Sequence, residues 1–251
     1  MKTNCRLVGI AAIALGLAVA SVSGTSTTDA RIEQSAKQTY VFRTYLKNDT
    51  ITIRSQDGVV TLAGTVSDAS HKNLAEDTVA ALPGVKRVDN QLKVENPSPP
   101  ASSDDWISAK VKAALLFHRS VSAATQVYVT DGVVTLKGTA ANQAQIDLTT
   151  AYARDVDGVK DVVNDMAVAA GTEPAPSLSD RVDDASITAE VKLTLLVHRS
   201  TSALNTSVAT TRGVVTLTGT AKNQAQIDLT TKLVKDIQGV KDVHNEMAIA
   251  G

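Results

Sequence analysis

The chain has 251 residues, of which 25 are Lys or Arg and 26 are Asp or Glu, so its formal net charge is −1. Proteins that bind nucleic acid usually carry a basic excess, and this balance argues against nucleic acid as a partner. The single cysteine, Cys5, lies near the N-terminus. Disulfides, thiol chemistry and thiolate metal sites are therefore not expected in the rest of the chain.

Residues 1–20 have the pattern of a secretory signal peptide. Lys2 and Arg6 give a positive start, and the apolar run that follows is roughly 14 residues long, shorter than the about 20 residues of a membrane-spanning helix. Ala18–Ala20 is an A-x-A cleavage site. We therefore expect export to the periplasm through a cleavable signal, with a mature chain that begins near Ser21, rather than an uncleaved N-terminal anchor.

The rest of the chain repeats one unit three times, and a repeat of this kind determines the fold. The sequence NQAQIDLTT occurs identically at residues 142–150 and 223–231. DGVVTLKGTA at 131–140 matches RGVVTLTGTA at 212–221, and a diverged copy, DGVVTLAGTV, stands at 57–66. We therefore predict three modules of the same architecture, the first of which is diverged.

Proline-rich segments separate the three copies, as expected of semi-rigid spacers between domains. The predicted organisation is a first module at residues 31–96, a linker at 97–103, a second module at 104–170, a linker at 171–179 and a third module at 180–251.

The first helix of each module is predicted from apolar residues at helical spacing. In the second module, Ser103, Asp104 and Asp105 are suitable capping residues before this helix. The residues expected on its core-facing side are Ile107, Val111, Ala114, Leu115 and His118.

The rest of the second module predicts two strands, a helix and a last strand. Val127–Val129 and Val133–Leu136 flank a Thr-Asp-Gly hairpin turn. Residues 142–156 are expected to be helical, with Ala144, Leu148 and Ala151 on one side, and residues 162–168 form the last strand. The predicted fold class is α+β: three tandem αββαβ modules, each a three-stranded sheet covered on one face by two helices.

Two patterns carry a family resemblance. G-V-V-T-L-x-G-T is followed, after a helix, by G-V-K-x-V-x-N-x-[ML]-x-[VI], and together they resemble the BON domain. The resemblance covers nearly all of the chain after the signal. It implies αββαβ modules in a bacterial envelope protein. It also implies association with phospholipid membranes, or a periplasmic stress role that includes chaperone-like activity.

Two histidines recur at equivalent positions. His118 and His198 are each followed by Arg-Ser. A histidine repeated in tandem modules predicts a repeated structural contact near the end of the helix. A phosphate contact by His118 and Arg119 is the alternative, and catalysis is the least favoured interpretation.

Asparagines also recur, and they follow a valine in the last strand of each module. The expected role of Asn90, Asn164 and Asn245 is a turn or a backbone hydrogen bond, with a ligand contact as the alternative. The sequence contains no metal-binding His pair, nucleotide-binding loop or nucleophile elbow. No enzyme activity, cofactor, nucleotide or metal is therefore expected.

A second apolar stripe lies on the back of the first helix of the second module. Trp106, Ala113 and Phe117 form it, and Lys110 borders it. An aromatic stripe flanked by cations suits a membrane interface, although packing between modules is the alternative. The predicted lipid-binding residues are Trp106, Lys110, Ala113, Phe117, His118 and Arg119.

The expected function is non-catalytic. The chain would bind phospholipid membrane surfaces in the periplasm and support envelope integrity under osmotic stress. The alternative is a soluble periplasmic chaperone whose partners are unfolded envelope proteins. A hydrolase is disfavoured because no catalytic constellation supports it.

The proline-rich segments generate the first prediction. Limited proteolysis should cut first within residues 96–103 or 171–177, because exposed linkers admit proteases before folded modules do. Mass spectrometry of the early fragments checks this. First cuts within residues 132–168, inside the second module, would contradict the predicted organisation.

Overall fold

The computed structural model describes residues 27–95, 99–122, 124–169, 182–201 and 205–250. The predicted signal peptide lies outside the described residues. So do the predicted linker at 171–179 and the start of the linker at 97–103. Within the described residues, no helix combines the length and the apolar character that crossing a membrane requires.

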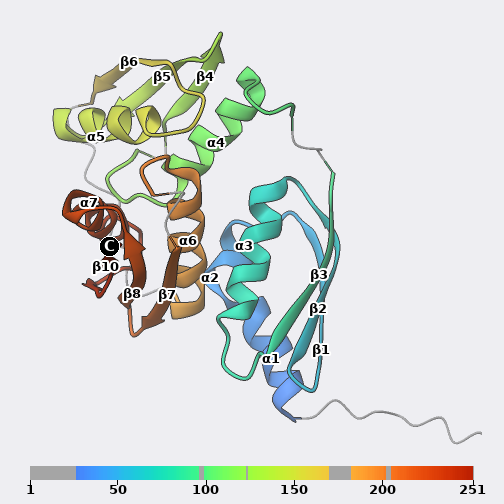
Figure 1. Ribbon diagram of the computed structural model, residues 1–251. Helices are drawn as coiled ribbons and strands as arrows, with labels where there is room; N and C mark the ends of the chain where they lie inside the picture. The colour runs from blue at the N-terminus through green and yellow to red at the C-terminus, as the bar shows by residue number, and fades with distance from the viewer. Residues whose placement is uncertain (1–26, 96–98, 123, 170–181, 202–204, 251) are drawn as a thin grey trace, which may run out of the picture.

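The structure confirms the α+β class and the three tandem modules (Figure 1). Module 1 contains α1 (Thr27–Gln38), α2 (Tyr40–Thr44), β1 (Thr50–Gln56), β2 (Val59–Val66), α3 (Ala69–Ala80) and β3 (Arg87–Val94). Module 2 contains α4 (Asp104–Leu116), β4 (Gln126–Thr130), β5 (Val133–Ala140), α5 (Gln143–Arg154) and β6 (Asp161–Val168). Module 3 contains α6 (Asp184–Val197), β7 (Asn205–Thr211), β8 (Val214–Ala221), α7 (Gln224–Lys235), β9 (Asp242–Asn245) and β10 (Ala248–Ile249).

Each sheet places the second strand of its module at the centre. The first strand pairs with it antiparallel through a hairpin, and the last strand pairs with it parallel. A parallel pair needs a crossover connection, and α3, α5 and α7 supply it. This explains the helix that always lies between the second and third strands.

Module 1 departs from the repeat at its first helix. By their distance to the hairpin glycine, residues 32–46 align with the first helices of the other two modules, which predicts one helix here. The structure breaks this helix at Thr39, which is extended at φ −59° and ψ 152°. The Thr39 hydroxyl donates to the Ala36 carbonyl (2.8 Å) and accepts from the Phe42 N–H (3.4 Å). The break creates α2 and leaves its first backbone N–H groups available to another module.

The hairpin turn of each module is held by an aspartate from the first helix. In module 2, Asp131 and Gly132 both have positive φ, as a two-residue type I′ turn requires. The Asp104 carboxylate accepts from both of their N–H groups at 2.8 Å. The actual N-cap is Ser103, which accepts from the Trp106 N–H. Asp29 and Asp184 hold the other two turns in the same way.

The buried face of the second helix differs from the prediction. Ala144, Leu148 and Ala151 are exposed, and the side chains that face the core are Ile146, Thr149 and Ala153. A threonine can be buried here because its hydroxyl donates to the Gln145 carbonyl at 2.7 Å within the helix. Assigning the face from aliphatic side chains alone therefore selected the wrong side.

The first helix of module 2 agrees with its predicted core side, since Ile107, Val111, Ala114, Leu115 and His118 are all buried. The asparagine prediction is also confirmed. Asn164 donates to the Ile146 carbonyl (3.2 Å) and accepts from the Met166 N–H (2.9 Å), which ties the last strand to α5. Asn90 and Asn245 make the equivalent bonds.

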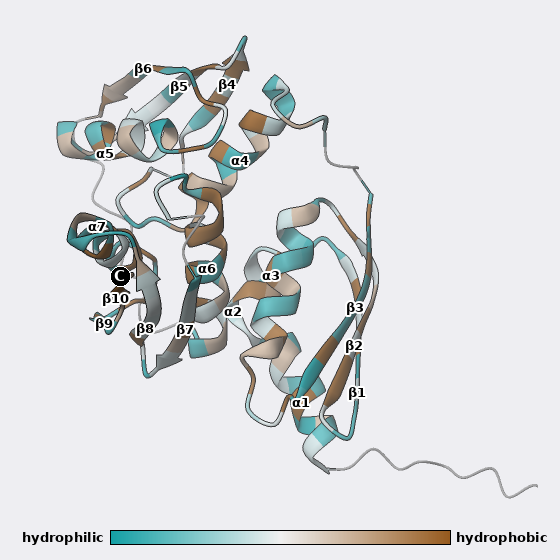
Figure 2. Ribbon diagram, viewed as in Figure 1, coloured by the Kyte–Doolittle hydropathy of each residue, from teal (hydrophilic) through white to brown (hydrophobic). Residues whose placement is uncertain are grey.

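The three modules pack around one helix, α6 (Figure 1). It contacts β7 of its own module, α3 of module 1 and α4 of module 2. All residues of α6 are buried except Asp184, Lys192 and Leu196. Figure 2 shows hydrophobic colouring along much of this helix. Because one module of this size has a thin core of its own, sharing α6 gives the three modules a common core.

The aspartate at the hairpin turn generates a stability prediction. Asp104→Ala should lower the free energy of unfolding of module 2 by about 1.5–3 kcal/mol, because the two N–H groups of the hairpin turn lose a charged acceptor. Urea unfolding followed by the fluorescence of Trp106, the only tryptophan, measures this.

Asp105→Ala is the matched control, since Asp105 is the exposed neighbour on the same helical turn. Equal urea midpoints for the two variants would contradict the role assigned to Asp104.

Candidate functional site

The His-Arg-Ser segments that follow α4 and α6 dock on each other's modules. His118 Nδ1 lies 3.2 Å from Oδ2 of Asp236, the residue that caps the end of α7 in module 3. His198 Nδ1 lies 3.3 Å from Oδ2 of Asp155, which caps the end of α5 in module 2. Both imidazoles are buried. Each module therefore contributes one histidine and one aspartate to a reciprocal contact.

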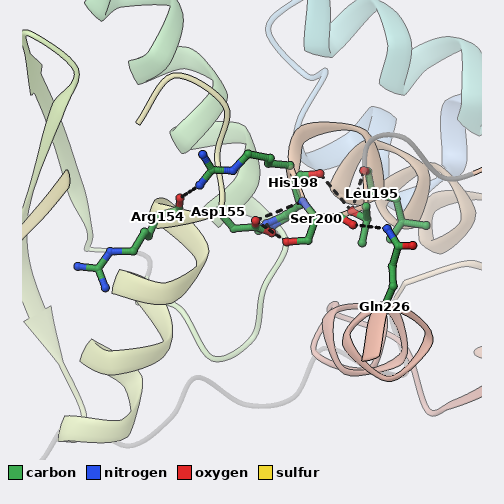
Figure 3. Close-up of polar contacts among 8 residues, drawn as sticks. Arg154, Asp155, Leu195, His198, Ser200 and Gln226 are labelled. Carbon is green, nitrogen blue, oxygen red and sulfur yellow. Dashed lines mark hydrogen bonds and ion pairs between the residues drawn. The ribbon is translucent and has the colours of Figure 1, made fainter. Parts of the chain in front are cut away.

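The serines of the two segments bind the same aspartates. Ser120 Oγ donates to Asp236 Oδ1 at 2.5 Å, and Ser200 Oγ donates to Asp155 Oδ1. Figure 3 shows Asp155, on the chain that ends α5, pointing toward His198 and Ser200. Each carboxylate thus lies between a histidine and a serine from the other module.

The arginines add main-chain bonds to this contact. The Arg119 N–H donates to the Asp236 carbonyl (2.9 Å), and the Arg199 N–H donates to the Asp155 carbonyl (2.7 Å). The Arg199 guanidinium also donates to the Arg154 carbonyl at 2.8 Å (Figure 3). Carbonyls at a helix end have no partner within the helix, and these arginines supply one.

The contact has the form of a twofold interface inside one chain, in which the same surface is used by both partners. One residue breaks the symmetry. Tyr152 on α5 stacks on the His118 ring at 4.0 Å between centroids, and its hydroxyl donates to Asp236 Oδ2 at 2.8 Å. Leu233 stands at the equivalent position of α7. Asp236 is consequently bound by three side chains of module 2, whereas Asp155 is bound by two side chains of module 3 and accepts in addition from the Ser200 N–H at 3.2 Å.

The electrostatics follow from this packing. Burial alone would raise the pKa of Asp236, but its contacts with His118, Ser120 and Tyr152 outweigh burial and hold the pKa below its ordinary value of 3.8. Burial lowers the pKa of His118 from 6.5, although the nearby carboxylate opposes this. The pKa of Asp155 is also lowered, because hydrogen bonds from the module 3 segment outweigh its burial.

Module 1 docks by a different set of contacts, at the start of α6. The Tyr40 N–H donates to Asp183 Oδ2 at 2.7 Å, and the Val41 N–H donates to Ser186 Oγ at 3.0 Å. These donors are the backbone groups that the break at Thr39 leaves at the start of α2. The broken helix of module 1 is therefore what allows it to bind α6.

Two further contacts complete this docking. Lys192 Nζ on α6 lies 2.9 Å from Asp77 Oδ1 on α3. The Tyr45 ring meets the Phe117 ring edge to face, with 5.2 Å between centroids. Phe117 belongs to module 2, so one aromatic pair joins modules 1 and 2 beside α6.

The structure does not bring the six predicted lipid-binding residues to one open surface. Phe117 is 1% exposed and Ala113 is 7% exposed, because both pack inside the chain. His118 is buried in the reciprocal contact with Asp236. The side chain of Arg119 is partly exposed, but its guanidinium donates to the Val240 carbonyl of module 3 at 3.1 Å.

Trp106 and Lys110 remain on the open side of α4. Lys110 Nζ lies 4.3 Å from the centroid of the Trp106 ring, over its face. Both residues are only partly buried. This pair is the part of the predicted stripe that solvent reaches.

Sequence reasoning missed Asp155, Asp236 and Tyr152. A signal was present, because both aspartates stand three residues before the glycine of the G-V-K segment. Module 1 lacks the His-Arg-Ser segment and carries Ala81 at the aspartate position. The His-Arg-Ser segment and the aspartate occur together in modules 2 and 3 and are both absent from module 1, which could have indicated that they bind each other.

The polar groups of this site hold modules together. Among the described residues, no three or more His, Cys, Asp or Glu side chains gather in an arrangement that could hold a metal ion. A crevice of about 270 Å³ lies between α3, α6 and β7. Its charged lining residues are engaged, since Lys192 binds Asp77 and Asp184 binds the hairpin turn.

The reciprocal contact generates a prediction. Asp236→Ala should lower the free energy of unfolding by about 2–4 kcal/mol, and Asp155→Ala by about 1–3 kcal/mol, because each leaves buried donors without a charged acceptor. The larger effect belongs to Asp236 because Tyr152 donates only to it. Urea unfolding at neutral pH measures both.

Asp157→Ala is the control, because the Asp157 side chain is 53% exposed and makes a long ion pair, 3.9 Å, with Lys110.

The contact should also depend on pH. A lowered carboxyl pKa gives stability that is present above the ordinary pKa and is lost as the pH falls through the pKa of the folded state. The lowered pKa of His118 acts in the same direction below pH 6.5. Acid should therefore loosen the contact, and Asp236→Ala should reduce that acid sensitivity. Identical behaviour of all three variants would refute the contact.

The chain is remotely similar to a solved structure. CdsD, described as a structural protein of the type III secretion system of Chlamydia trachomatis, is 18% identical. The match covers 87% of this chain and 90% of that one, with a TM-score of 0.24.

Two curated relatives are closer in sequence. Osmotically-inducible protein Y of Escherichia coli (strain K12) is 37% identical over 145 residues, which cover 57% of this chain and 71% of the relative. An uncharacterized protein from the gshII 5′ region of Anaplasma centrale is 30% identical over 128 residues, which cover 51% of this chain and 83% of the relative.

The family model of the BON domain matches three times, at residues 28–96, 103–170 and 183–251. These ranges contain the three modules of the structure and the G-V-V-T-L and G-V-K segments of each. The chain belongs to the BON domain family.

Proposed function

We propose that the chain is a non-catalytic periplasmic protein that acts during osmotic stress by binding the phospholipid surface of the envelope. The observation that carries this proposal is the 37% identity to Osmotically-inducible protein Y over 71% of that relative. The signal-like residues 1–20 support an envelope location. The family relationship supports a stress role that needs no catalytic residues.

The open side of α4 is the surface that we assign to the membrane. Trp106 and Lys110 correspond to Ser186 and Glu190 of α6, at an offset of 80 residues. Module 1 covers that side of α6, whereas the same side of α4 keeps its aromatic and its cation partly exposed. An aromatic ring beside a lysine suits the interface between lipid headgroups and acyl chains.

The expected binding is weak. Burying one aromatic side chain contributes roughly 1.5–3 kcal/mol, and each nearby Lys or Arg adds about 1 kcal/mol at an anionic surface. Lys112 is exposed on the same helix, whereas the Arg119 guanidinium is held by module 3. Binding should therefore be reversible and should weaken as salt screens the charges.

A chaperone role for unfolded envelope proteins is the second candidate, and the exposed apolar side chains favour it. Most of the large ones form equivalent pairs in modules 2 and 3: Leu116 and Leu196, Leu148 and Leu229, Val168 and Ile249. Exposed apolar side chains can bind apolar segments of a partner.

The membrane proposal predicts the effect of Trp106→Ala combined with Lys110→Ala. Cosedimentation with anionic phospholipid vesicles should fall about tenfold or more, because the aromatic and the cation act at the same surface. Trp106 emission of the wild-type chain should shift to the blue when these vesicles are added. Phe117 is left in place, because it is buried and its loss would disturb the packing.

Tyr128→Ala combined with Lys137→Ala is the matched control. It removes another exposed aromatic with a lysine over its ring, at 5.7 Å, from the sheet of the same module. Equal losses for the two double variants, or no vesicle binding by the wild type, would overturn the assignment. Suppression of client aggregation without lipid would then favour the chaperone.

A further inference from the structure

Glu190 is a fully buried carboxyl in the middle of α6. It is 0% exposed, and neither of its oxygens has a hydrogen-bond partner among the described residues. Burying a charged carboxylate without a partner is costly, so a buried carboxyl normally binds a proton instead. An isolated Glu at this place needs an explanation.

The burial of Glu190 comes from neighbouring modules. The equivalent residue of module 2 is Lys110, which is only partly buried and has its ammonium group over Trp106. In module 2 this helix position is therefore partly open to solvent. Glu190 follows Ser186 by one turn, and Ser186 binds the Val41 N–H of module 1. Module 1 thus converts a surface position into an interior one.

The groups around Glu190 do not neutralise it. Asp183, at the start of the same helix, is negative and acts against ionisation. Tyr45 caps the end of α2 and packs edge to face on Tyr40, and burial followed by the Glu190 charge raises the pKa of Tyr45, so its hydroxyl stays neutral. From α3, Asp77 is paired with Lys192 of α6. At the end of α4, the Phe117 ring packs on Tyr45 and carries no charge.

We propose that module 1 is a releasable cover over α6, closed when Glu190 carries a proton and opened when Glu190 is ionised. Once module 1 leaves, water can solvate the carboxylate. Among the described residues, Tyr40, Val41 and Lys192 make the polar bonds described above that hold the cover. The inference does not rest on membrane binding, because both partners lie within the chain.

The direction of the pH dependence follows from linkage. Burial raises the pKa of Glu190 well above 4.5, and Asp183 adds to this. The closed state therefore holds the proton more tightly than the open state. Closure is fully stabilised below the ordinary pKa and weakens as the pH rises toward the raised value. The contact between modules 2 and 3 responds in the opposite direction, since acid loosens it.

Hydrogen exchange of single amides tests the proposal in the full chain. The Tyr40 and Val41 amides report closure, because their acceptors lie in module 3. The Arg119 and Arg199 amides report the contact between modules 2 and 3. Protection at each pH is taken relative to the intrinsic exchange rate at that pH.

Between pH 5 and pH 8, protection of the Tyr40 and Val41 amides should fall about tenfold or more, since each unit of pKa difference is a factor of ten. The Arg119 and Arg199 amides should lose no protection over the same pH range. Glu190→Gln should abolish the fall, and Lys110→Gln, the equivalent change in module 2, should preserve it.

Unchanged protection of Tyr40 and Val41 in the wild type would overturn the proposal, as would the same fall in Glu190→Gln. Should Glu190→Gln fail to fold, the wild-type comparison between the two pairs of amides decides alone.

Discussion

The burial of α6 by all three modules is the constraint on which the rest of the structure depends. A module of this size has little interior of its own, and α6 provides an interior that the modules share. Its two ends are used differently. Asp183 and Ser186 at the start bind the backbone of module 1, and His198 at the end binds Asp155 of module 2. The three repeats are therefore parts of one packed body.

Duplication explains why modules 2 and 3 fit each other. Each carries a His-Arg-Ser segment and an aspartate at the end of its second helix, so a single surface is complementary to its own copy. Module 1 lacks both and binds through the break at Thr39 instead. Its contacts bury Glu190 without a partner, whereas the reciprocal contact satisfies both of its aspartates. The carboxylates of one junction are consequently satisfied, and the other junction contains a carboxyl group that favours opening.

Features that depend on local spacing could be predicted from the sequence. The order of helices and strands along each module, the core side of α4 and the bonds of Asn164 follow from repeats and periodicity within one module. Features that depend on packing between modules could not. The pairing of Asp155 with His198 joins residues that local patterns treat separately. Phe117 is an apolar residue on the outer side of its helix, and the sequence alone is compatible with a contact to lipid or to another module. In the structure, the Tyr45 ring of module 1 contacts Phe117 on that side. Tertiary packing also makes Thr149 a core residue, which aliphatic spacing alone did not indicate.

Contact between Tyr45 and Phe117 tests the shared core most directly. These rings belong to modules 1 and 2 and meet only if both modules pack beside α6. Nuclear Overhauser spectra at pH 6, with the phenylalanine and tyrosine rings selectively labelled, should contain cross-peaks between them, because their centroids are 5.2 Å apart. Cross-peaks from Tyr45 to Tyr40 of its own module, 5.7 Å away, serve as the internal reference. Spectra in which Tyr45 contacts Tyr40 but not Phe117 would mean that the modules are independent, and would contradict the account.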